Sequence, residues 1–324
     1  MTRTSGHPGG SHDPLRASET RVLALVGPTA VGKSALAEDL ALRLNGEVVS
    51  ADSMQVYRGM DIGTAKLSIA ARRVAHWCVD VADPGESFSA AAYQQVARRA
   101  IRDIATRDRL PIVCGGTGLY VRAALDDLRF PPPSAAAEET RARYEQVADA
   151  DGAQALHSLL AERDPASAAL LHHNNVRRVI RALEMLDDGV SYAQQQSGFA
   201  VRASIFDARF VGLTMDRSRL YARIDQRVDA MVEAGLLDEV RSLVETGLGT
   251  ALTAMQAIGY KELVPVIEGH GSLDEAVAGI KTASRRYAKR QLTWFRADPR
   301  IEWVDVTDHT LADTAEHVLG TLDW

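Results

Sequence analysis

The chain has 324 residues, of which 46% are hydrophobic, enough for a large core or for two domains. Its 37 Lys and Arg residues and 43 Asp and Glu residues give a net charge of −6, which at first argues against a nucleic-acid partner. No run of about eighteen apolar residues occurs, so we expect no membrane span.

Residues 1–20 are rich in Gly, Ser, Thr, His and Pro and contain no apolar stretch. We therefore expect a disordered tail rather than a signal peptide. Cys78 and Cys114 fall in apolar, strand-like runs without metal-ligand spacing. Reduced core cysteines are typical of cytoplasmic proteins, so we expect a cytoplasmic location.

The first predicted elements are a strand at 21–26 and a helix at 35–44, joined by a glycine-rich turn. In such a turn the backbone N–H groups point inward around phosphate oxygens, and the helix start adds partial positive charge. Lys33 neutralises the distal phosphate and Ser34 is a ligand of Mg²⁺ in this pattern, so we expect a phosphorylated ligand with Mg²⁺. The turn fits the P-loop pattern G-x-x-x-x-G-K-[ST] at every position and reads Gly27-Pro28-Thr29-Ala30-Val31-Gly32-Lys33-Ser34.

Two further predicted strands, at 46–51 and 110–114, are separated by a helix at 89–106. Strands that alternate with helices imply a parallel sheet, whose ligands bind beyond the carboxyl ends of the strands. The second strand is followed by Asp52-Ser53-Met54-Gln55, and the third by Gly115-Gly116-Thr117-Gly118. We therefore expect both segments to converge with the P-loop on one crevice.

Asp52 stands where P-loop enzymes place an acid that polarises water or holds Mg²⁺. Two other roles stay open, a general base for an amine or hydroxyl, and a cap for the next turn of the loop. Thr64 and Lys66, farther along, are candidates for additional phosphate contacts. The third strand ends in Gly115-Gly116 rather than in an acidic pair. This absence weakens the case for an ATP-hydrolysing enzyme and is compatible with a different diphosphate ligand.

A proline run at 131–133 marks a predicted boundary. We predict a helical insertion at 130–204 within a P-loop core formed by 21–129 and 205–324. The fold class is α/β, a P-loop NTPase-like parallel sheet flanked by helices, with an inserted all-helical domain. In its second part the core is predicted to contain a strand at 210–213, helices at 220–233, 237–244 and 272–295, and a final strand at 301–306.

Arg223 and Arg227 lie four residues apart, on one face of a predicted helix. They are candidates for stabilising the charge on a departing phosphate group. The alternative is a pair of surface arginines bridged to Asp225 or Asp229, and the sequence alone favours neither.

Two basic strips favour RNA despite the acidic net charge. In the second strip the cations alternate with Trp294 and Phe295, a mixture that suits RNA phosphates and unstacked bases. The alternative is a helix whose two aromatic side chains belong to the core. The strips consist of Arg177, Arg178 and Arg181, and of Lys281, Arg285, Arg286, Lys289, Arg290 and Arg296.

Taken together, these segments resemble the tRNA dimethylallyltransferases, also called tRNA isopentenyltransferases. The matching pieces are GPTAVGKS, DSMQVYRGMDIGTAK, GGTGLY, RVIRALE, RIDQRVDAMVEAGLLDEV, QAIGYKE and KRQLTWFR. They occur in family order over residues 21–306, and the combination is far more specific than the P-loop alone. The resemblance implies transfer of a dimethylallyl group from dimethylallyl diphosphate to N6 of adenosine 37 of tRNA, just 3′ of the anticodon, with diphosphate as the other product.

The same resemblance implies roles for individual residues. Asp52 accepts a proton or a hydrogen bond from the adenine amine, the helical insertion grips the anticodon arm, and the enzyme acts as a monomer. The residues implied to bind or orient the diphosphate are Thr29, Lys33, Thr117, Arg223 and Arg227. The residues implied to contact tRNA are Asp52, Ser53, Met54, Gln55, Thr117, Arg141, Arg177, Arg178, Arg181, Gln256, Gly259, Tyr260, Lys261, Lys289, Arg290, Gln291, Trp294 and Arg296.

Three other functions compete with this interpretation. An adenylate isopentenyltransferase keeps the P-loop and Asp52 but needs no anticodon-arm domain, so the helical insertion and the basic helix favour tRNA. A small-metabolite kinase is disfavoured because the acid after the third strand and a nucleotide-reading motif are missing. A non-catalytic RNA-binding protein is disfavoured because Lys33, Ser34 and Asp52 are all present.

Overall fold

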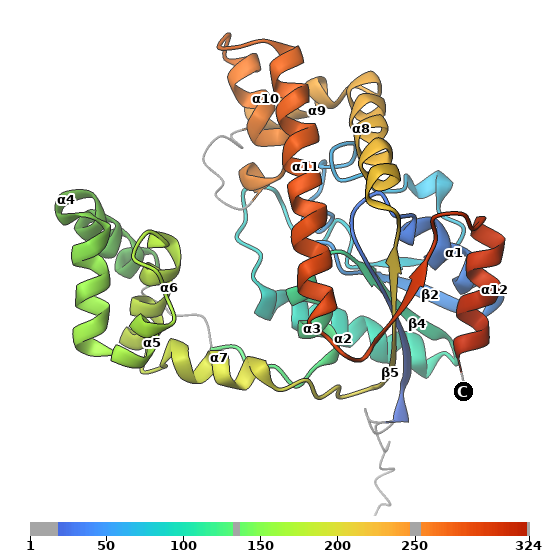
Figure 1. Cartoon of the computed structure of the whole chain (residues 1–324), viewed down its shortest axis with the longest axis horizontal. Coiled ribbons are helices and arrows are strands. Elements are labelled where there is room, and N and C mark those ends of the chain that lie inside the picture. Colours follow the sequence, from blue (N-terminus) through green and yellow to red (C-terminus); the bar gives the residue numbers. More distant parts are fainter. Residues whose placement is uncertain (1–18, 132–136, 247–253, 323–324) are drawn as a thin grey trace, which may run out of the picture. The chain divides into compact units, whose positions relative to one another are not determined.

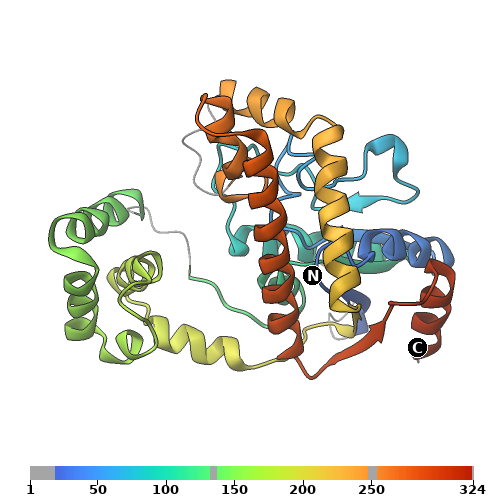
Figure 2. The same cartoon turned by 45° about the horizontal axis from the view of Figure 1, so that its top comes forward.

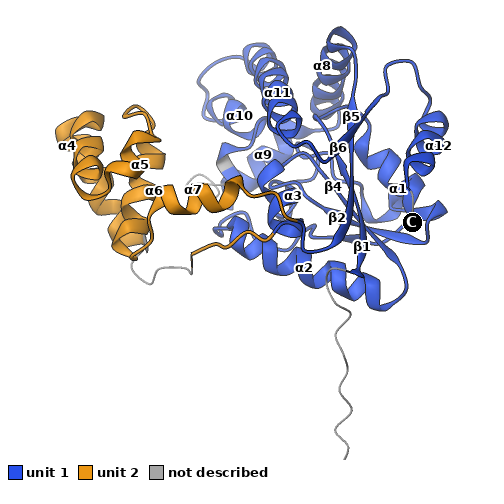
Figure 3. Ribbon diagram, turned by 60° about the horizontal axis from the view of Figure 1, so that its bottom comes forward, with its two compact units in different colours: residues 1–126, 204–324 blue, residues 127–203 orange. Residues whose placement is uncertain are grey.

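The computed structural model describes residues 19–131, 137–246 and 254–322. Nearly all of the predicted N-terminal tail, and part of the proline boundary, lie outside these residues. The chain divides into two compact units, one formed by residues 1–126 and 204–324 and the other by residues 127–203 (Figure 3). No helix in the described part is long and apolar enough to cross a membrane.

The first unit is built on six strands, all parallel, in the order β3-β2-β4-β1-β5-β6. The central strand β1 pairs with β4 on one side and β5 on the other, which explains why its sequence is a continuous apolar run. The sheet confirms the predicted fold class. The strands are β1 (Arg21–Val26), β2 (Gly46–Ser50), β3 (His76–Trp77), β4 (Leu110–Gly115), β5 (Asp207–Thr214) and β6 (Ile301–Asp305).

Helices cover this sheet, and two of them, α8 and α11, run side by side (Figures 1 and 2). The sequence predicted five of the helices to within a few residues but missed α3, α10 and α12, as well as the two-residue strand β3. The helices of this unit are α1 (Lys33–Arg43), α2 (Ala90–Thr106), α3 (Gly118–Leu125), α8 (Arg217–Glu233), α9 (Leu236–Glu245), α10 (Tyr260–Ile267), α11 (Leu273–Arg296) and α12 (Leu311–Thr321), with short 3₁₀ turns at Ile69–Ala71 and Ala254–Gln256.

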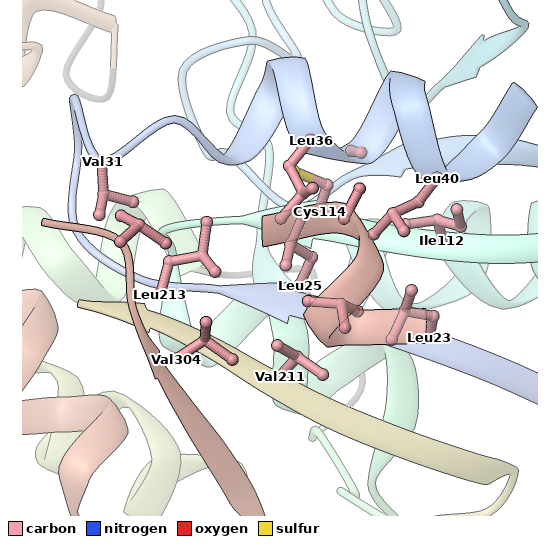
Figure 4. Close-up of a cluster of buried hydrophobic side chains, with 14 of the residues drawn as sticks. Leu23, Leu25, Val31, Leu36, Leu40, Ile112, Cys114, Val211, Leu213 and Val304 are labelled. Carbon is pink, nitrogen blue, oxygen red and sulfur yellow. The ribbon is translucent and has the colours of Figure 1, made fainter. Parts of the chain in front are cut away.

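One hydrophobic core cluster joins the sheet to the helix α1 and includes buried side chains of α8, α11 and α12 (Figure 4). Leu23 and Leu25 of β1 meet Leu36 and Leu40 of α1, and all four side chains are buried. Burial of a side chain of this size contributes roughly 1.5–3 kcal/mol, so this contact fixes the start of α1 relative to β1. Because the P-loop connects β1 to α1, this contact also fixes both ends of the loop. Cys78 and Cys114 are free and buried, as predicted.

In the described part of the second unit, all regular secondary structure is helical. Its core joins Leu156 and Leu160 with Val179 and Leu183, so it has a hydrophobic interior of its own. Sequence predicted to be helix-like from residue 135 onward forms these helices. They are α4 (Ala137–Arg163), α5 (Pro165–Ala169), α6 (Val176–Asp187) and α7 (Tyr192–Ala200).

Candidate active site

The loops after β1, β2 and β4 meet at one cavity, called here the phosphate cavity, which confirms the predicted crevice. The loop after β1 makes a close approach to β5. Gly27 has φ 145°, and a Cβ at this position would lie 2.7 Å from the Leu213 carbonyl oxygen, so no other residue fits. The cavity is lined by Thr29, Ala30, Gly32, Lys33, Ser34, Ala35, Asp52, Gln55, Thr64, Ala65, Leu67, Cys114, Gly115, Gly116, Arg223, Arg227, Tyr287 and Gln291.

Lys33 is the first residue of α1, and its ammonium donates a hydrogen bond to the Pro28 carbonyl at 2.6 Å. Burial, aided by the nearby Arg227, lowers the pKa of Lys33 to about 8, while Cys114 and Asp52 oppose the shift. An anion bound in the cavity would restore the charged form. Lys33 is therefore arranged to respond to a phosphate group.

Ser34 and Asp52 bring oxygen donors to the same cavity. Mg²⁺ prefers oxygen ligands and takes one or two from the protein, with the others from phosphate and water, so a hydroxyl and a carboxylate here fit this ion. Among the described residues, no group of three or more His, Cys, Asp or Glu side chains could hold a metal ion by itself. A metal at Ser34 would thus depend on the phosphorylated ligand.

Hydrogen bonds between loops hold Asp52 and Thr117 in place. The Met54 amide donates to Asp52 Oδ1 at 2.8 Å, so the carboxylate caps its own turn with one oxygen. Thr117 Oγ1 accepts from the Ser53 amide at 3.0 Å, which ties the loop after β4 to the loop after β2. Asp52 can thus cap the turn with one carboxylate oxygen and still take the predicted catalytic role with the other.

Gln291, on α11, braces the phosphate cavity. Its Oε1 accepts from the Thr29 amide at 2.8 Å, and its Nε2 donates to the Gly116 carbonyl at 3.0 Å. The side chain is only 5% exposed, and a Cβ on Gly116 would lie 2.1 Å from Nε2. This placement argues against the predicted tRNA contact of Gln291, because both ends of its amide are used inside the protein.

Tyr287 lies on the same helix, one turn before Gln291, and lines the cavity with it. Burial raises the pKa of Tyr287 to about 12, while hydrogen bonds with Thr117 and Gln291 lower it. Sequence reasoning missed this residue. The spacing of four from Gln291 was the available signal, since it places both side chains on one helix face.

Arg223 and Arg227 both line the phosphate cavity. Burial lowers the pKa of Arg227, and the carboxylate of Asp52 opposes the shift. The alternative pairing with Asp225 and Asp229 is wrong. Asp225 pairs with Arg285 at 2.6 Å and Asp229 with Lys281 at 2.6 Å, because these acids face α11.

A second cavity adjoins the first and shares Thr29, Asp52, Thr64, Arg227 and Tyr287 with it. We call it the adjoining cavity. Its remaining lining comes mainly from α8, α11 and residues 256–261, and includes apolar side chains as well as predicted tRNA contacts. The predicted tRNA contacts in this lining, beyond the shared Asp52, are Ser53, Met54, Gln256, Gly259, Tyr260, Lys261 and Arg290.

Two of these residues, Gly259 and Tyr260, are buried within the wall of the adjoining cavity. Tyr260 is fully buried, and its hydroxyl donates to Glu239 Oε1 at 2.6 Å. Gly259 precedes α10, and its amide donates to Glu262 Oε2 at 2.7 Å. Gln256 and Lys261 are exposed. Within the QAIGYKE segment, the structure therefore buries Gly259 and Tyr260 and exposes Gln256 and Lys261.

The basic strip on α11 is divided in the same way. Lys281 and Arg285 pair with acids of α8, whereas Lys289, Arg290 and Arg296 are exposed. Trp294 is 45% exposed, while its neighbour Phe295 is buried. The core alternative is thus right for Phe295, and the RNA contact of Trp294 stays a prediction.

In the second unit, the predicted arginines fall into two groups. Arg141 and Arg181 both pair with the buried carboxylate of Glu184, at 2.8 and 3.1 Å. Their charges therefore stabilise a buried acid as well as facing solvent. Arg177 and Arg178 begin α6, are exposed, and have no ion pair among the described residues.

Lys66 was predicted to contact phosphate, but it does not line the phosphate cavity. Its ammonium is buried and bonds to the Tyr57 carbonyl, to Asp61 at 2.9 Å and to Asp80 at 2.6 Å. Thr64 does line both cavities, although its hydroxyl donates to the Met60 carbonyl at 2.6 Å. Lys66 is a structural cation that holds the loop after β2.

The chain is similar to a known protein family in sequence. A family model described as IPP transferase matches residues 55–298. The tRNA dimethylallyltransferase of Geobacillus thermodenitrificans is 49% identical over 290 residues, which cover 89% of this chain and 91% of that protein. The tRNA dimethylallyltransferase of Bacillus cytotoxicus is 46% identical over 304 residues, which cover 93% and 96%.

Solved structures agree with the sequence comparisons. The full-length tRNA isopentenylpyrophosphate transferase of Bacillus halodurans matches with a TM-score of 0.69 and 44% identity, over 93% of this chain and 96% of that one. A eukaryotic dimethylallyltransferase acting on tRNA matches with a TM-score of 0.76 and 27% identity, over 93% and 78%. Because family model, sequence and fold all coincide, the chain belongs to the IPP transferase family.

Proposed function

We propose that this chain transfers a dimethylallyl group from dimethylallyl diphosphate to N6 of adenosine 37 of tRNA and releases diphosphate. The observation that carries the proposal is the pair of cavities that share Asp52, Thr29 and Arg227. A diphosphate in the first cavity and an adenine in the second would place donor and acceptor on either side of Asp52. Relatives named tRNA dimethylallyltransferase support the same reaction.

The chemistry follows from the groups in the phosphate cavity. The amides of the P-loop, together with Lys33 and Arg227, stabilise the charge that develops on the diphosphate as the allylic C–O bond breaks. The N6 lone pair forms the new C–N bond, and the amine proton passes to the Asp52 carboxylate. Because an exocyclic amine is a weak nucleophile, positioning and leaving-group stabilisation dominate the rate.

Mg²⁺ belongs to the proposal. The Ser34 hydroxyl would hold it, with diphosphate oxygens and water as other ligands. Bound there, it supplies additional neutralisation of the leaving group. Thr29 lines the phosphate cavity and keeps its proposed role in orienting the diphosphate, and Arg223 adds positive charge beside the P-loop. Thr117 lines neither cavity, and its proposed part is to hold the neighbouring loop through the bond from the Ser53 amide.

tRNA binding rests on exposed cations. Lys289, Arg290 and Arg296 on α11, with Arg177 and Arg178 in the second unit, are available for phosphate contacts. The target base must leave the anticodon stack, at a cost of a few kcal/mol, and backbone contacts offset this cost. We further propose that the protein acts in the cytoplasm as a monomer.

The test is incubation of the purified protein with radiolabelled dimethylallyl diphosphate, Mg²⁺ and either unmodified tRNA or AMP. Label in tRNA only, mapped to the nucleotide 3′ of the anticodon, is the expected result. Label in AMP would instead indicate an adenylate isopentenyltransferase. No label in either acceptor would overturn the proposal, and ATP turnover would then test the kinase alternative.

A further inference from the structure

A short loop, residues 61–64, forms part of the wall between the two cavities. Gly63 lines the adjoining cavity, and Thr64 lines both. The loop has no regular secondary structure of its own, so its position depends on what binds its backbone. On one side Lys66 holds it, through the bond to Asp61 at 2.9 Å.

On the other side, a single carboxylate binds three successive backbone amides. Glu239 Oε2 accepts from Asp61 N at 2.9 Å and from Ile62 N at 2.7 Å, while Oε1 accepts from Gly63 N at 3.1 Å. The Tyr260 hydroxyl donates to Oε1 at 2.6 Å. Four donors thus converge on Glu239 from two segments far apart in sequence.

The close fit of this arrangement extends to the glycine. A Cβ on Gly63 would lie 2.5 Å from the Tyr260 ring, so the loop backbone packs directly against that side chain. Successive amides that point to one side form a concave anion site, and a carboxylate is the ligand such a site prefers. Glu239 is therefore an internal anion for the loop.

The neighbouring acid shows that this is more than a helix-start effect. Asp238 and Glu239 both lie in the first turn of α9. Asp238 has a side chain that is 77% exposed and pairs with Arg241 on the same helix. Only Glu239 reaches across to the loop, which makes Asp238 a matched control.

We propose that Glu239 is a positioning residue that clamps residues 61–63 to α9 and α10, and that these amides form an anion site which a small carboxylate can fill when the side chain is removed. Through Thr64, the clamp holds the wall that both substrates share. The consequence for turnover rests on the proposed function, whereas the anion site itself does not.

The first measurement is hydrogen exchange of the peptide spanning residues 59–67, in wild type, Glu239→Ala and Asp238→Ala. We expect faster exchange in Glu239→Ala, restoration by acetate, and wild-type exchange in Asp238→Ala. Unchanged exchange in Glu239→Ala, or exchange that acetate does not slow, would overturn the clamp. This readout holds even if the wild type fails to prenylate tRNA, so it separates the two proposals.

The second measurement is prenyl transfer with and without acetate. Glu239→Ala should lose roughly tenfold in kcat or more, with acetate recovering most of the loss and leaving the wild type unaffected. Glu239→Gln keeps the size but replaces one acceptor oxygen with a donor, so it should be intermediate and unresponsive to acetate. It also serves as the test variant if Glu239→Ala does not fold. Wild-type kcat in both variants would overturn the positioning role.

Discussion

The phosphate cavity and the adjoining cavity share a wall but are built in different ways. The first is lined mainly by loops that directly follow β1, β2 and β4, so its groups come from short segments next to buried strands. The second is lined mainly by α8, α11 and residues 256–261, whose positions depend on packing between distant parts of the chain. Strand ends aim backbone groups directly, whereas helix packing places side chains through long-range contacts.

This contrast has a functional meaning. Substitutions in the loops should act on the bond-breaking step. Substitutions on the helices should act on stability and on tRNA binding, except at Arg223 and Arg227 of α8, which are proposed to stabilise the leaving diphosphate. Asp52 lines both cavities, and Gln291 connects a helix to a loop. Substitutions at these two residues therefore test whether loop and helix positions have separate effects.

The largest effect is expected at Asp52. Asp52→Ala should lower turnover roughly 10³-fold and leave tRNA affinity nearly unchanged, because a positioned acid or base typically contributes 10²–10⁴-fold. Single-turnover assays and filter binding measure the two quantities. Comparable losses in both would refute the catalytic assignment and move Asp52 to the RNA-binding surface.

Gln291→Leu should come next, as a loss of stability. It leaves the Thr29 amide and the Gly116 carbonyl without their partner, at a cost of about 1–3 kcal/mol for each buried group. Denaturant unfolding measures the change. Gln226→Leu, at an exposed position of α8, is the matched control, and an equal effect of both substitutions would contradict the bracing role.

A pH dependence is expected from Lys33. Its pKa of about 8 in the free protein must rise when diphosphate binds, so binding takes up a proton at higher pH. Affinity for dimethylallyl diphosphate should therefore fall as the pH rises above 8, by up to about tenfold per pH unit, with no loss from this group below that value. Calorimetric titrations between pH 7 and 9.5 check the slope, and Lys33→Met should be weaker throughout and flat over this range.

The smallest effect is expected in the second unit. Arg178→Ala should weaken tRNA binding several-fold and reduce the salt dependence by about one phosphate contact, while prenyl transfer at saturating tRNA stays unchanged. Filter binding at several salt concentrations gives the slope. Arg181→Ala should instead destabilise the unit as well, because Arg181 pairs with the buried Glu184. Identical behaviour of the two variants would erase that distinction.

The sequence predicted the first cavity better than the second. The P-loop, Asp52 and the segment at Gly115-Gly116 follow apolar strands, and a parallel sheet brings such ends together by topology alone. For Gln291 and Tyr260 the sequence predicted contact with tRNA but did not reveal that both side chains are buried. Their burial depends on the packing of α10 and α11, which residue type and spacing do not reveal.

The sequence also failed to predict several short helices and one short strand. The strand β3 has two residues, and the helices α3 and α10 have eight each, too few for a periodic pattern to stand out. Glu239 gave no signal because an acid in the first helical turn is expected at any helix start. Its partners, three consecutive amides in a distant loop, become visible only in the folded chain.

The brace between Gln291 and Thr29 also bears on how the protein is made. The two residues are 262 positions apart, so the ribosome completes the P-loop long before the side chain that steadies it exists. During synthesis the nascent chain therefore carries a phosphate-binding loop whose Thr29 amide lacks its final acceptor. Contacts of such long separation form late in folding. A chain released before α11 would retain the whole P-loop motif yet lack the support that the finished enzyme gives it.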